Sequence, residues 1–541
     1  MRRRFWVIAT ALLALGCSAD RATGPVSLRL LAFNDFHGNI QSADPSPGRI
    51  PIVKDGKTEL VDAGGAAYLA PLIAQERAGH PNTLLVSAGD LTGASPMLSG
   101  LLKDEPTIRV MNGIGLDLNV VGNHEFDSGS EELVRKSGLA QFAYLAANVV
   151  DTASGQPLFP PYVVKKVGGI DVAFIGVVTK ETPHIVAARG VTGLRFLDET
   201  ETLNRYAADL SRQGIHAIVA VIHEGATPGA DTPTDGSNCK DLAGALVDIV
   251  QRSDPAIDLF ISGHTHQNYA CKLDGRMVTQ AANYGRMLSV IDLTLDPASR
   301  DVLGVAASNL PVTRDLTPDA KVLAELSQAD AATAPMRAKK VATLPIALLR
   351  KPADSGESAL GDVIADAQLA AARELGAELA ITNPGGIRQD LPSDPAKGLS
   401  VSLGDLFAVQ PFGNNLVAMD VTGAELKLLL EQQWLGQPED RKPRILQISS
   451  GFTYCYDSSR PEGDRILAAS MQLNGKPIVP ATSYRIAVNN FLAGGGDRFV
   501  VLKDGRHQVQ GGSDLDALRD YLVEAAPGLK GDVAGRICRK G

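Results

Sequence analysis

The chain has 541 residues, of which 44% are hydrophobic and 21% are charged, and its formal net charge is −9. This length exceeds the number of residues that usually fold around one hydrophobic core, so we expect two or three globular domains. The negative charge argues against a general binder of nucleic-acid polymers, because neutralising a phosphate backbone requires an excess of Lys and Arg. A small phosphorylated substrate agrees with this charge, since a few local cations or metals are enough to hold it.

The first residues have the pattern of a signal peptide. The basic segment MRRR precedes the apolar run FWVIATALLALG, which is too short to span a bilayer as a helix. The run ends in LALGC, which resembles the lipobox of bacterial lipoproteins. This resemblance implies a signal peptide over 1–17 and lipidation of Cys17, and Ser18 after it suggests an anchor at the periplasmic face of the outer membrane or the cell surface. The alternative is an ordinary secretory signal with an incidental cysteine.

The four remaining cysteines are Cys239, Cys271, Cys455 and Cys538. An even number in an exported protein fits disulfides, and four cysteines allow three connectivities. We favour Cys239–Cys271 and Cys455–Cys538, because each pair would then lie within one domain. Free buried thiols are the alternative.

The region 26–315 repeats one pattern, in which an apolar run leads directly into polar residues. The runs and the residues that follow them are VSLRLLAF before NDFHGN, NTLLVSA before GD, LNVV before GNHEFD, HAIVAVI before HEG, and IDLFIS before GHTHQ. Near-continuous apolar runs are typical of strands buried on both faces, and helical segments such as GGAAYLAPLIAQERAG lie between some of them. The pattern predicts a layered α/β domain whose ligands gather at the strand ends.

The composition changes after residue 315. The region 316–344 is rich in Ala, Lys and Glu, which predicts a linker helix. A second domain is expected over 345–541, with the helix ESALGDVIADAQLAAARELG, the strand ELAIT and the turn NPGGIR. Thr422 and Glu425 have the spacing of a capping box at the start of a later helix.

The polar strand ends carry five of the nine histidines. Each residue alone has an ordinary explanation as a turn or cap, but clustered charge is costly unless something compensates it. A pair of divalent metal ions would do so, and mixed Asp, His and Asn ligands suit Zn²⁺ or Mn²⁺. The residues concerned are Asp35, His37, Asp90, Asn123, His124, His223, His264 and His266.

In order and spacing, these blocks resemble the dinuclear metallophosphoesterase superfamily over residues 28–290. The resemblance implies a four-layered αββα sandwich. It also implies one metal ion held by Asp35, His37, Asp90 and His266. A second ion would be held by Asp90, Asn123, His223 and His264, so that Asp90 bridges the two.

The same resemblance implies that His124 is catalytic and faces the substrate phosphate rather than a metal ion. Asp127, three residues later, would hold the imidazole in one tautomer and keep it protonated. A local turn cap is the alternative for Asp127. We expect Glu125 to be structural or solvent-facing.

The blocks NPGGIR, VQPFGN and NFLAGGGDRF resemble the C-terminal domain of periplasmic and cell-surface 5′-nucleotidases. The resemblance implies a smaller α/β substrate-binding domain that swings about a hinge near 340–350. Taken singly, the phenylalanines would be core residues and the glycines a tight turn. The family has further arginines ahead of the GGIR block. This chain offers Arg350 there, but Asp354 stands where a second arginine is expected, and Arg373 on the following helix is the candidate substitute. The implied substrate-binding residues are Arg388 for phosphate, Phe412 and Phe491 for the base, Asn414 for the base edge, Asp497 for ribose, and Asn383 and Arg350.

These resemblances predict an exported, metal-dependent nucleotide phosphohydrolase with two divalent metal ions (Zn, Mn or similar). It would cleave 5′-nucleotides to nucleoside and inorganic phosphate by attack of a metal-activated water. The enzymatic alternatives are a 2′,3′-cyclic-nucleotide phosphodiesterase, a UDP-sugar hydrolase, and a dimanganese thiosulfohydrolase, which should lack the paired phenylalanines. The non-enzymatic alternative is a nucleotide-binding surface lipoprotein. The sequence makes no prediction of the oligomeric state.

Overall fold

The computed structural model describes residues 24–540 except 42–48, 55–56, 187, 230–231, 395–397 and 438–442. The expected signal peptide and Cys17 lie outside the described residues. Among the described residues, no helix combines the length and the apolar character needed to cross a bilayer.

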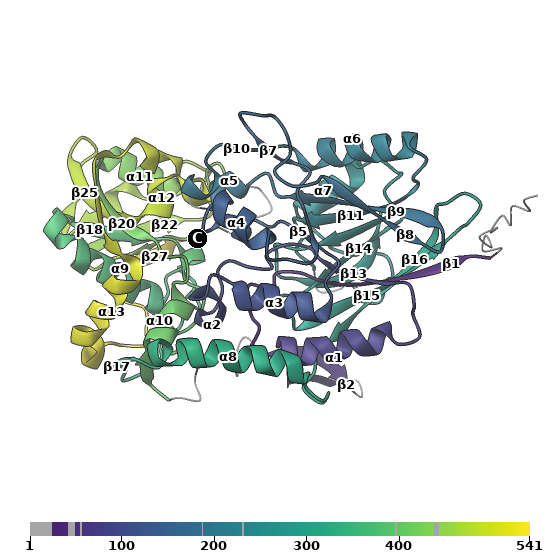
Figure 1. Cartoon of the computed structure of the whole chain (residues 1–541). Helices are drawn as coiled ribbons and strands as arrows, with labels where there is room; N and C mark the ends of the chain where they lie inside the picture. The colour runs from purple at the N-terminus through teal and green to yellow at the C-terminus, as the bar shows by residue number, and fades with distance from the viewer. Residues whose placement is uncertain are drawn as a thin grey trace, which may run out of the picture.

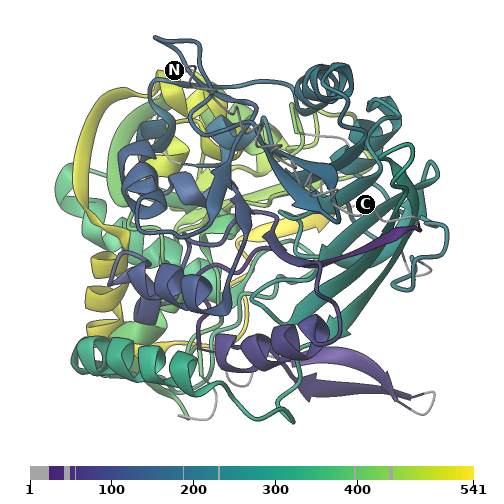
Figure 2. The same ribbon diagram turned by 45° about the vertical axis from the view of Figure 1, so that its right-hand side comes forward.

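The N-terminal domain contains two six-stranded sheets (Figures 1 and 2). In the first sheet the strand order is β16-β15-β1-β4-β5-β6, with β1, β4, β5 and β6 parallel and β15 and β16 antiparallel to their neighbours. Its strands are β1 (Val26–Phe33), β4 (Thr83–Ser87), β5 (Leu118–Val120), β6 (Ala143–Leu145), β15 (Met287–Leu295) and β16 (Val302–Pro311).

The second sheet has the order β13-β14-β12-β11-β9-β8, and its four central strands are parallel. Its strands are β8 (Tyr162–Val167), β9 (Ile170–Val178), β11 (Ala217–His223), β12 (Leu259–Ser262), β13 (Asn268–Leu273) and β14 (Arg276–Ala281). Smaller elements of the domain are β2 (Arg49–Lys54), β3 (Lys57–Asp62), β7 (Val149–Asp151), β10 (Leu194–Phe196), α2 (Met97–Gly100), α4 (Ser130–Ser137) and α5 (Thr182–Ile185).

Three hydrophobic cores define the layers of this domain. One core lies between the two sheets and contains Leu30 and Val219. A second joins the other face of the first sheet to α1 (Ala66–Arg77), α3 (Glu105–Ile114) and α8 (Ala320–Arg337). A third joins the second sheet to α6 (Glu199–Arg212) and α7 (Ala245–Arg252). The expected αββα sandwich is therefore confirmed, and its strands are apolar throughout because both faces of each sheet are covered.

Helix α8 runs along one side of the molecule from the N-terminal to the C-terminal domain (Figure 1). It begins after the N-cap Asp319 and ends at Arg337, so the last residues of the expected helical region 316–344 are not helical. They form β17 (Lys340–Thr343), which pairs with β19 (Ser400–Ser402). Ala342 is buried in the second domain, and this packing outweighs the helix propensity of the segment.

The C-terminal domain is built around a five-stranded sheet of order β21-β18-β25-β20-β26. Helix α9 (Ala359–Ala372) packs on one face and α11 (Gly423–Glu431) on the other. The predicted capping box of Thr422 and Glu425 is present at the start of α11. The other elements are β18 (Leu379–Thr382), α10 (Leu403–Val409), β20 (Asn415–Thr422), β21 (Gln447–Ile448), β22 (Phe452–Asp457), β23 (Gln472–Leu473), β24 (Lys476–Pro477), β25 (Ser483–Asn489), α12 (Asn490–Ala493), β26 (Arg506–Ser513), α13 (Asp514–Ala525) and β27 (Ile537–Lys540).

Both favoured disulfides are present. The Cα atoms of Cys239 and Cys271 lie 4.9 Å apart, and those of Cys455 and Cys538 lie 4.5 Å apart. The second disulfide joins the parallel strands β22 and β27. Each pair lies within one domain, as expected.

Candidate active site

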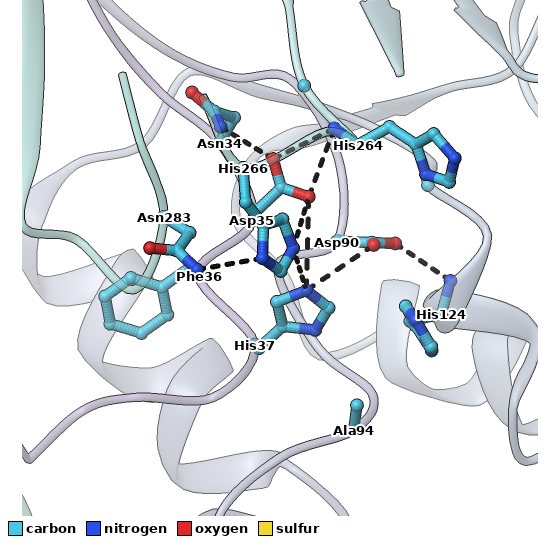
Figure 3. A network of polar contacts seen from close by, with 12 residues as sticks. Asn34, Asp35, Phe36, His37, Asp90, Ala94, His124, His264, His266 and Asn283 are labelled. Atoms are coloured by element: carbon cyan, nitrogen blue, oxygen red, sulfur yellow. Dashed lines mark hydrogen bonds and ion pairs between the residues drawn. The ribbon is translucent and has the colours of Figure 1, made fainter. Parts of the chain in front are cut away.

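The carboxyl ends of five strands bring the polar tips together. Strands β1, β4 and β5 are parallel neighbours in one sheet, and β11 and β12 are parallel neighbours in the other. Their tips therefore emerge at one edge of the sandwich, where ligands of α/β sheets gather. Figure 3 shows six of these residues close together, namely Asp35, His37, Asp90, His124, His264 and His266.

The residues form two groups with the geometry of cation sites. In one group the side-chain donor atoms of Asp35, His37 and His266 lie within 4.8 Å of one another. In the other, those of Asp90, His223 and His264 do so. Asp90 stands between the groups, because its Oδ2 lies 3.1 Å from Nε2 of His223 and 3.6 Å from Nε2 of His37.

The donor set fits divalent cations. Nδ1 of His223 donates to the carbonyl of Ala88 at 2.8 Å, so its Nε2 faces the oxygens of Asp90 and Asn123. Nδ1 of His37 donates to a carbonyl in the same way. Oδ2 of Asp90 is buried and has no well-aligned hydrogen-bond partner among the described residues, although Nε2 of His223 is close. Burial opposes charge on His223, yet Asp90 outweighs it and raises the pKa of His223 to about 10. The site thus favours positive charge, which bound cations would supply.

The backbone is strained at most of the expected ligands. Five of the seven have positive φ angles, a region that side chains other than glycine rarely adopt. Such residues cost of order 1–3 kcal/mol each and persist only where the surroundings hold them. The sharp turns aim the side chains inward directly after the strands. The angles are 50° at Asp35, 47° at His37, 50° at Asp90, 71° at His264 and 59° at His266.

His124 is held from two sides. Its Nδ1 lies 2.9 Å from a carboxylate oxygen of Asp127, and its backbone N–H donates to Oδ1 of Asp90 at 2.8 Å. Burial lowers the pKa of His124, but the carboxylates of Asp127 and Asp90 outweigh this effect and raise the pKa above its ordinary value. The two carboxylates thus favour the protonated imidazole, the form in which both ring nitrogens donate.

A cavity of about 820 Å³ lies between the two domains and is lined by both. From the N-terminal domain it is lined by Asp90, Asn123, His124, Asp127, His264 and His266. Asp35, His37 and His223 are fully buried. From the C-terminal domain the cavity is lined by Asn383, Arg388, Phe412, Asn414, Phe491 and Asp497.

Short contacts order the C-terminal side of the cavity. Nδ2 of Asn383 donates to Oδ2 of Asp497 at 3.0 Å. Cζ of Arg388 lies 5.7 Å from the ring centre of Phe412. A Cβ atom at Gly496 would lie 2.5 Å from the ring of Phe491, so the glycine is needed for that ring to sit where it does.

The arginines differ from the expectation. Arg350 is exposed and lies outside the lining of the cavity as the described residues define it, and Arg373 is exposed as well. Arg444 and Arg498 line the cavity instead. Arg444 pairs with Asp497, whereas Arg498 pairs with Glu181 of the N-terminal domain.

Sequence reasoning missed both arginines. Arg498 directly follows Asp497 inside the block NFLAGGGDRF, which was a signal available in the sequence. Arg444 lies in none of the three blocks, and only the fold brings it to Asp497.

Comparisons with known proteins agree with this architecture. Residues 28–268 match the family model of calcineurin-like phosphoesterases, and residues 338–504 match that of the 5′-nucleotidase C-terminal domain. The cell wall protein Lmo0130 of Listeria monocytogenes is 34% identical, over 94% of this chain and 68% of that protein. The endonuclease YhcR of Bacillus subtilis is 31% identical, over 96% of this chain but only 41% of its own length.

The fold is also found in solved structures. The crystal structure of a 5′-nucleotidase precursor from Thermus thermophilus aligns with a TM-score of 0.78 and 26% identity, and covers 95% of this chain and 99% of that one. Both domains and their order are therefore shared. The chain belongs to the 5′-nucleotidase family, and it is a hydrolase of phosphoric esters with a calcineurin-like metallophosphoesterase domain and a 5′-nucleotidase C-terminal domain.

Proposed function

We propose that the chain hydrolyses 5′-nucleotides to nucleoside and inorganic phosphate in the cavity between its domains. One observation carries the proposal. A single cavity of about 820 Å³ joins the cluster of Asp, His and Asn donors to two phenylalanines and a carboxylate of the C-terminal domain. This volume lies in the range of small-molecule sites and suits a phosphate at one end and a nucleoside at the other.

At the phosphate end, the residues would act as metal ligands, as a hydrogen-bond donor and as a source of positive charge. The residues that would hold two divalent ions are Asp35, His37, Asp90, Asn123, His223, His264 and His266. When bound, such ions lower the pKa of water and neutralise charge on phosphate oxygens. His124 lines the cavity and would donate to a phosphate oxygen as charge develops there, while Asp127 keeps the ring oriented. Arg388 supplies a further positive charge from the other domain.

At the nucleoside end, Phe412 and Phe491 would stack on the base. Stacking on an aromatic ring contributes about 1–3 kcal/mol per base and tolerates different bases. Asp497 is held by Asn383 and Arg444 and would accept from ribose hydroxyls. Asn414 is nearly buried and would bond the base edge.

A second activity is favoured by one relative. The Bacillus subtilis protein is named an endonuclease, which cleaves phosphodiesters. The phosphorus atom of a diester would occupy the same position at the metal centre as that of a monoester. A 2′,3′-cyclic-nucleotide phosphodiesterase or a bifunctional enzyme is therefore our alternative. Hydrolysis of UDP-sugars is a further alternative at the same site.

We also propose that the protein is exported and anchored by lipid on Cys17. The pattern of the first 17 residues supports this, as does the name of the Listeria relative, a cell wall protein. Metabolic labelling with a fatty acid that is lost in Cys17→Ser would support the anchor, whereas equal labelling of both proteins would exclude it.

Phosphate release from a panel of substrates tests the function. The panel contains AMP, ADP, a UDP-sugar, a 2′,3′-cyclic nucleotide and bis-p-nitrophenyl phosphate. The protein is stripped with a chelator and then given Mn²⁺, Zn²⁺ or Co²⁺. We expect activity to vanish on stripping, to return with metal, and to be highest on AMP. Full turnover after stripping would refute the metal centre, and binding of AMP without hydrolysis under every condition would favour a nucleotide-binding lipoprotein.

A further inference from the structure

Glu125 follows the candidate ligand Asn123 and the catalytic candidate His124, yet its side chain is fully buried and lies outside the lining of the cavity as the described residues define it. Its two carboxylate oxygens accept four backbone N–H groups. Oε2 accepts from Asp90 at 3.0 Å and from Gly122 at 2.7 Å. Oε1 accepts from Leu91 at 2.7 Å and from Thr92 at 3.2 Å.

The four donors come from two different loops of the site. One loop follows β4 and contains Asp90, while the other follows β5 and contains Asn123. The loops touch closely, since a Cβ atom at Gly122 would lie 2.3 Å from Oδ1 of Asp90. The single carboxylate of Glu125 therefore binds backbone N–H groups of both loops where the loops touch. A carboxylate suits this task, because its two oxygens offer enough acceptor sites for all four N–H groups.

The Asp90 loop needs such support. Asp90 and Ala94 both have positive φ angles, of 50° and 46°, so the loop is strained at each end. A second buried group also supports the loop, because Nζ of Lys136 donates to Oγ1 of Thr92 at 2.8 Å and lies 3.6 Å from Asp104. These contacts hold Asp90 in a conformation that it would not adopt in an unconstrained chain.

We infer that Glu125 is a positioning residue for the metal centre, which sets the place of Asp90 relative to Asn123 and thereby the affinity for the bridged cations. The inference rests on the metal centre of the proposed function but is independent of the substrate. Partners that orient metal ligands typically change metal affinity or activity by about 10–100-fold when they are altered.

The test compares Glu125→Gln with Glu131→Gln. Glutamine keeps the shape but replaces one oxygen with an NH₂ group, which leaves two of the four N–H groups without an acceptor. Glu131 is exposed on α4, so its variant controls for loss of one negative charge nearby. Each full-length protein is stripped of metal with a chelator, and its affinity for Mn²⁺ is measured by calorimetric titration. Thermal unfolding is recorded on the metal-free protein.

We expect Glu125→Gln to bind Mn²⁺ about 10–100-fold more weakly than the parent, and Glu131→Gln to match the parent. A purely structural role would lower the unfolding temperature but leave the Mn²⁺ affinity of the folded protein, and its kcat at saturating Mn²⁺, unchanged. That result would overturn the inference. A parent protein that does not bind Mn²⁺ would instead refute the proposed metal centre.

If Glu125→Gln does not fold, Glu125→Asp replaces it. The shorter side chain cannot reach all four donors, so we expect Mn²⁺ to bind about tenfold more weakly than in the parent. Parent-like affinity in this variant, or failure of both variants to fold, would overturn the inference in favour of a structural role alone.

Discussion

The imidazole of His124 and the ring of Phe412 are stacked, with centroids 5.6 Å apart and planes inclined by 21°. The two residues belong to different domains, so the catalytic candidate and a base-stacking candidate meet only because the domains are in contact. Arg388 lies against the same phenylalanine ring. The arrangement of the reacting groups therefore depends on how the C-terminal domain is placed against the sandwich.

Replacing His124 with alanine should lower kcat without loss of metal. The imidazole is expected to donate to a phosphate oxygen in the transition state, and loss of one such donor costs about 10²–10³ in kcat. Steady-state kinetics with AMP, together with the metal content of the purified protein, check this. His216→Ala is the control, because His216 is exposed. A drop in metal content that parallels the loss of activity would mean that His124 acts on the metal centre instead.

Replacing Phe412 or Phe491 with alanine should selectively weaken the binding of substrates that carry a nucleobase. We expect KM for AMP to rise by about 5–150-fold for each change, since a stacked base contributes about 1–3 kcal/mol. Turnover of bis-p-nitrophenyl phosphate, which lacks a base, should change far less. Phe196→Ala serves as the control, because Phe196 packs against Phe126 away from the cavity. Equal losses on both substrates would show that the rings shape the metal centre rather than bind the base.

The ion pair of Glu181 and Arg498 joins the two domains beside the cavity, and Nε of Arg498 lies 2.9 Å from Oε2 of Glu181. Glu181→Gln should shift the population toward separated domains by up to about fivefold, because a partly exposed ion pair contributes at most about 1 kcal/mol. Energy transfer between dyes at Ser154 and Val523 measures the shift. Glu201→Gln, an exposed change in the same domain, is the control.

Identical distance distributions in all three proteins would contradict a role of this pair in domain closure.

The expected hinge near 340–350 stays a prediction. Because Lys340–Thr343 form strand β17 of the second domain, we expect the rotation to occur just before this strand.

Asp258 should make stability depend on pH. Burial raises the pKa of Asp258 to about 7 from 3.8, although the N–H of Ile218 opposes this shift. The folded protein then holds a proton that the unfolded chain releases, so stability is highest below about pH 4 and falls as the pH rises toward about 7. Asp258→Asn should remove this loss, with a relative gain of at most about 4 kcal/mol at pH 8, since one pKa unit corresponds to about 1.4 kcal/mol.

Urea unfolding at pH 4, 6 and 8 measures the effect, and the exposed Asp532→Asn is the control. We expect the difference between Asp258→Asn and the parent to grow from pH 4 to pH 8, while the control stays parallel to the parent. A constant difference across the three pH values would show that folding does not raise the pKa of Asp258.

Much of the fold could be predicted from the sequence because its signals are local. The apolar runs and the polar residues directly after them are contiguous, so the sequence predicts both the strands β1, β4, β5, β11 and β12 and the candidate ligands at their ends. The capping box at Thr422 depends on residues three positions apart, and both disulfide pairs followed from assigning each cysteine to a domain. These features depend on short stretches of chain, where hydrophobic periodicity and backbone preference dominate.

Other features were decided only by the tertiary structure. The direction of a side chain after a turn does not follow from its neighbours, so the sequence left open whether Glu125 faces solvent, and the fold buries it under four N–H groups. Arg444 reaches the cavity and Arg350 does not, although only Arg350 lies near the expected motif. Which charges meet is set by the order of strands and by the contact between domains, because residues distant in the chain become neighbours only when apolar surfaces pack.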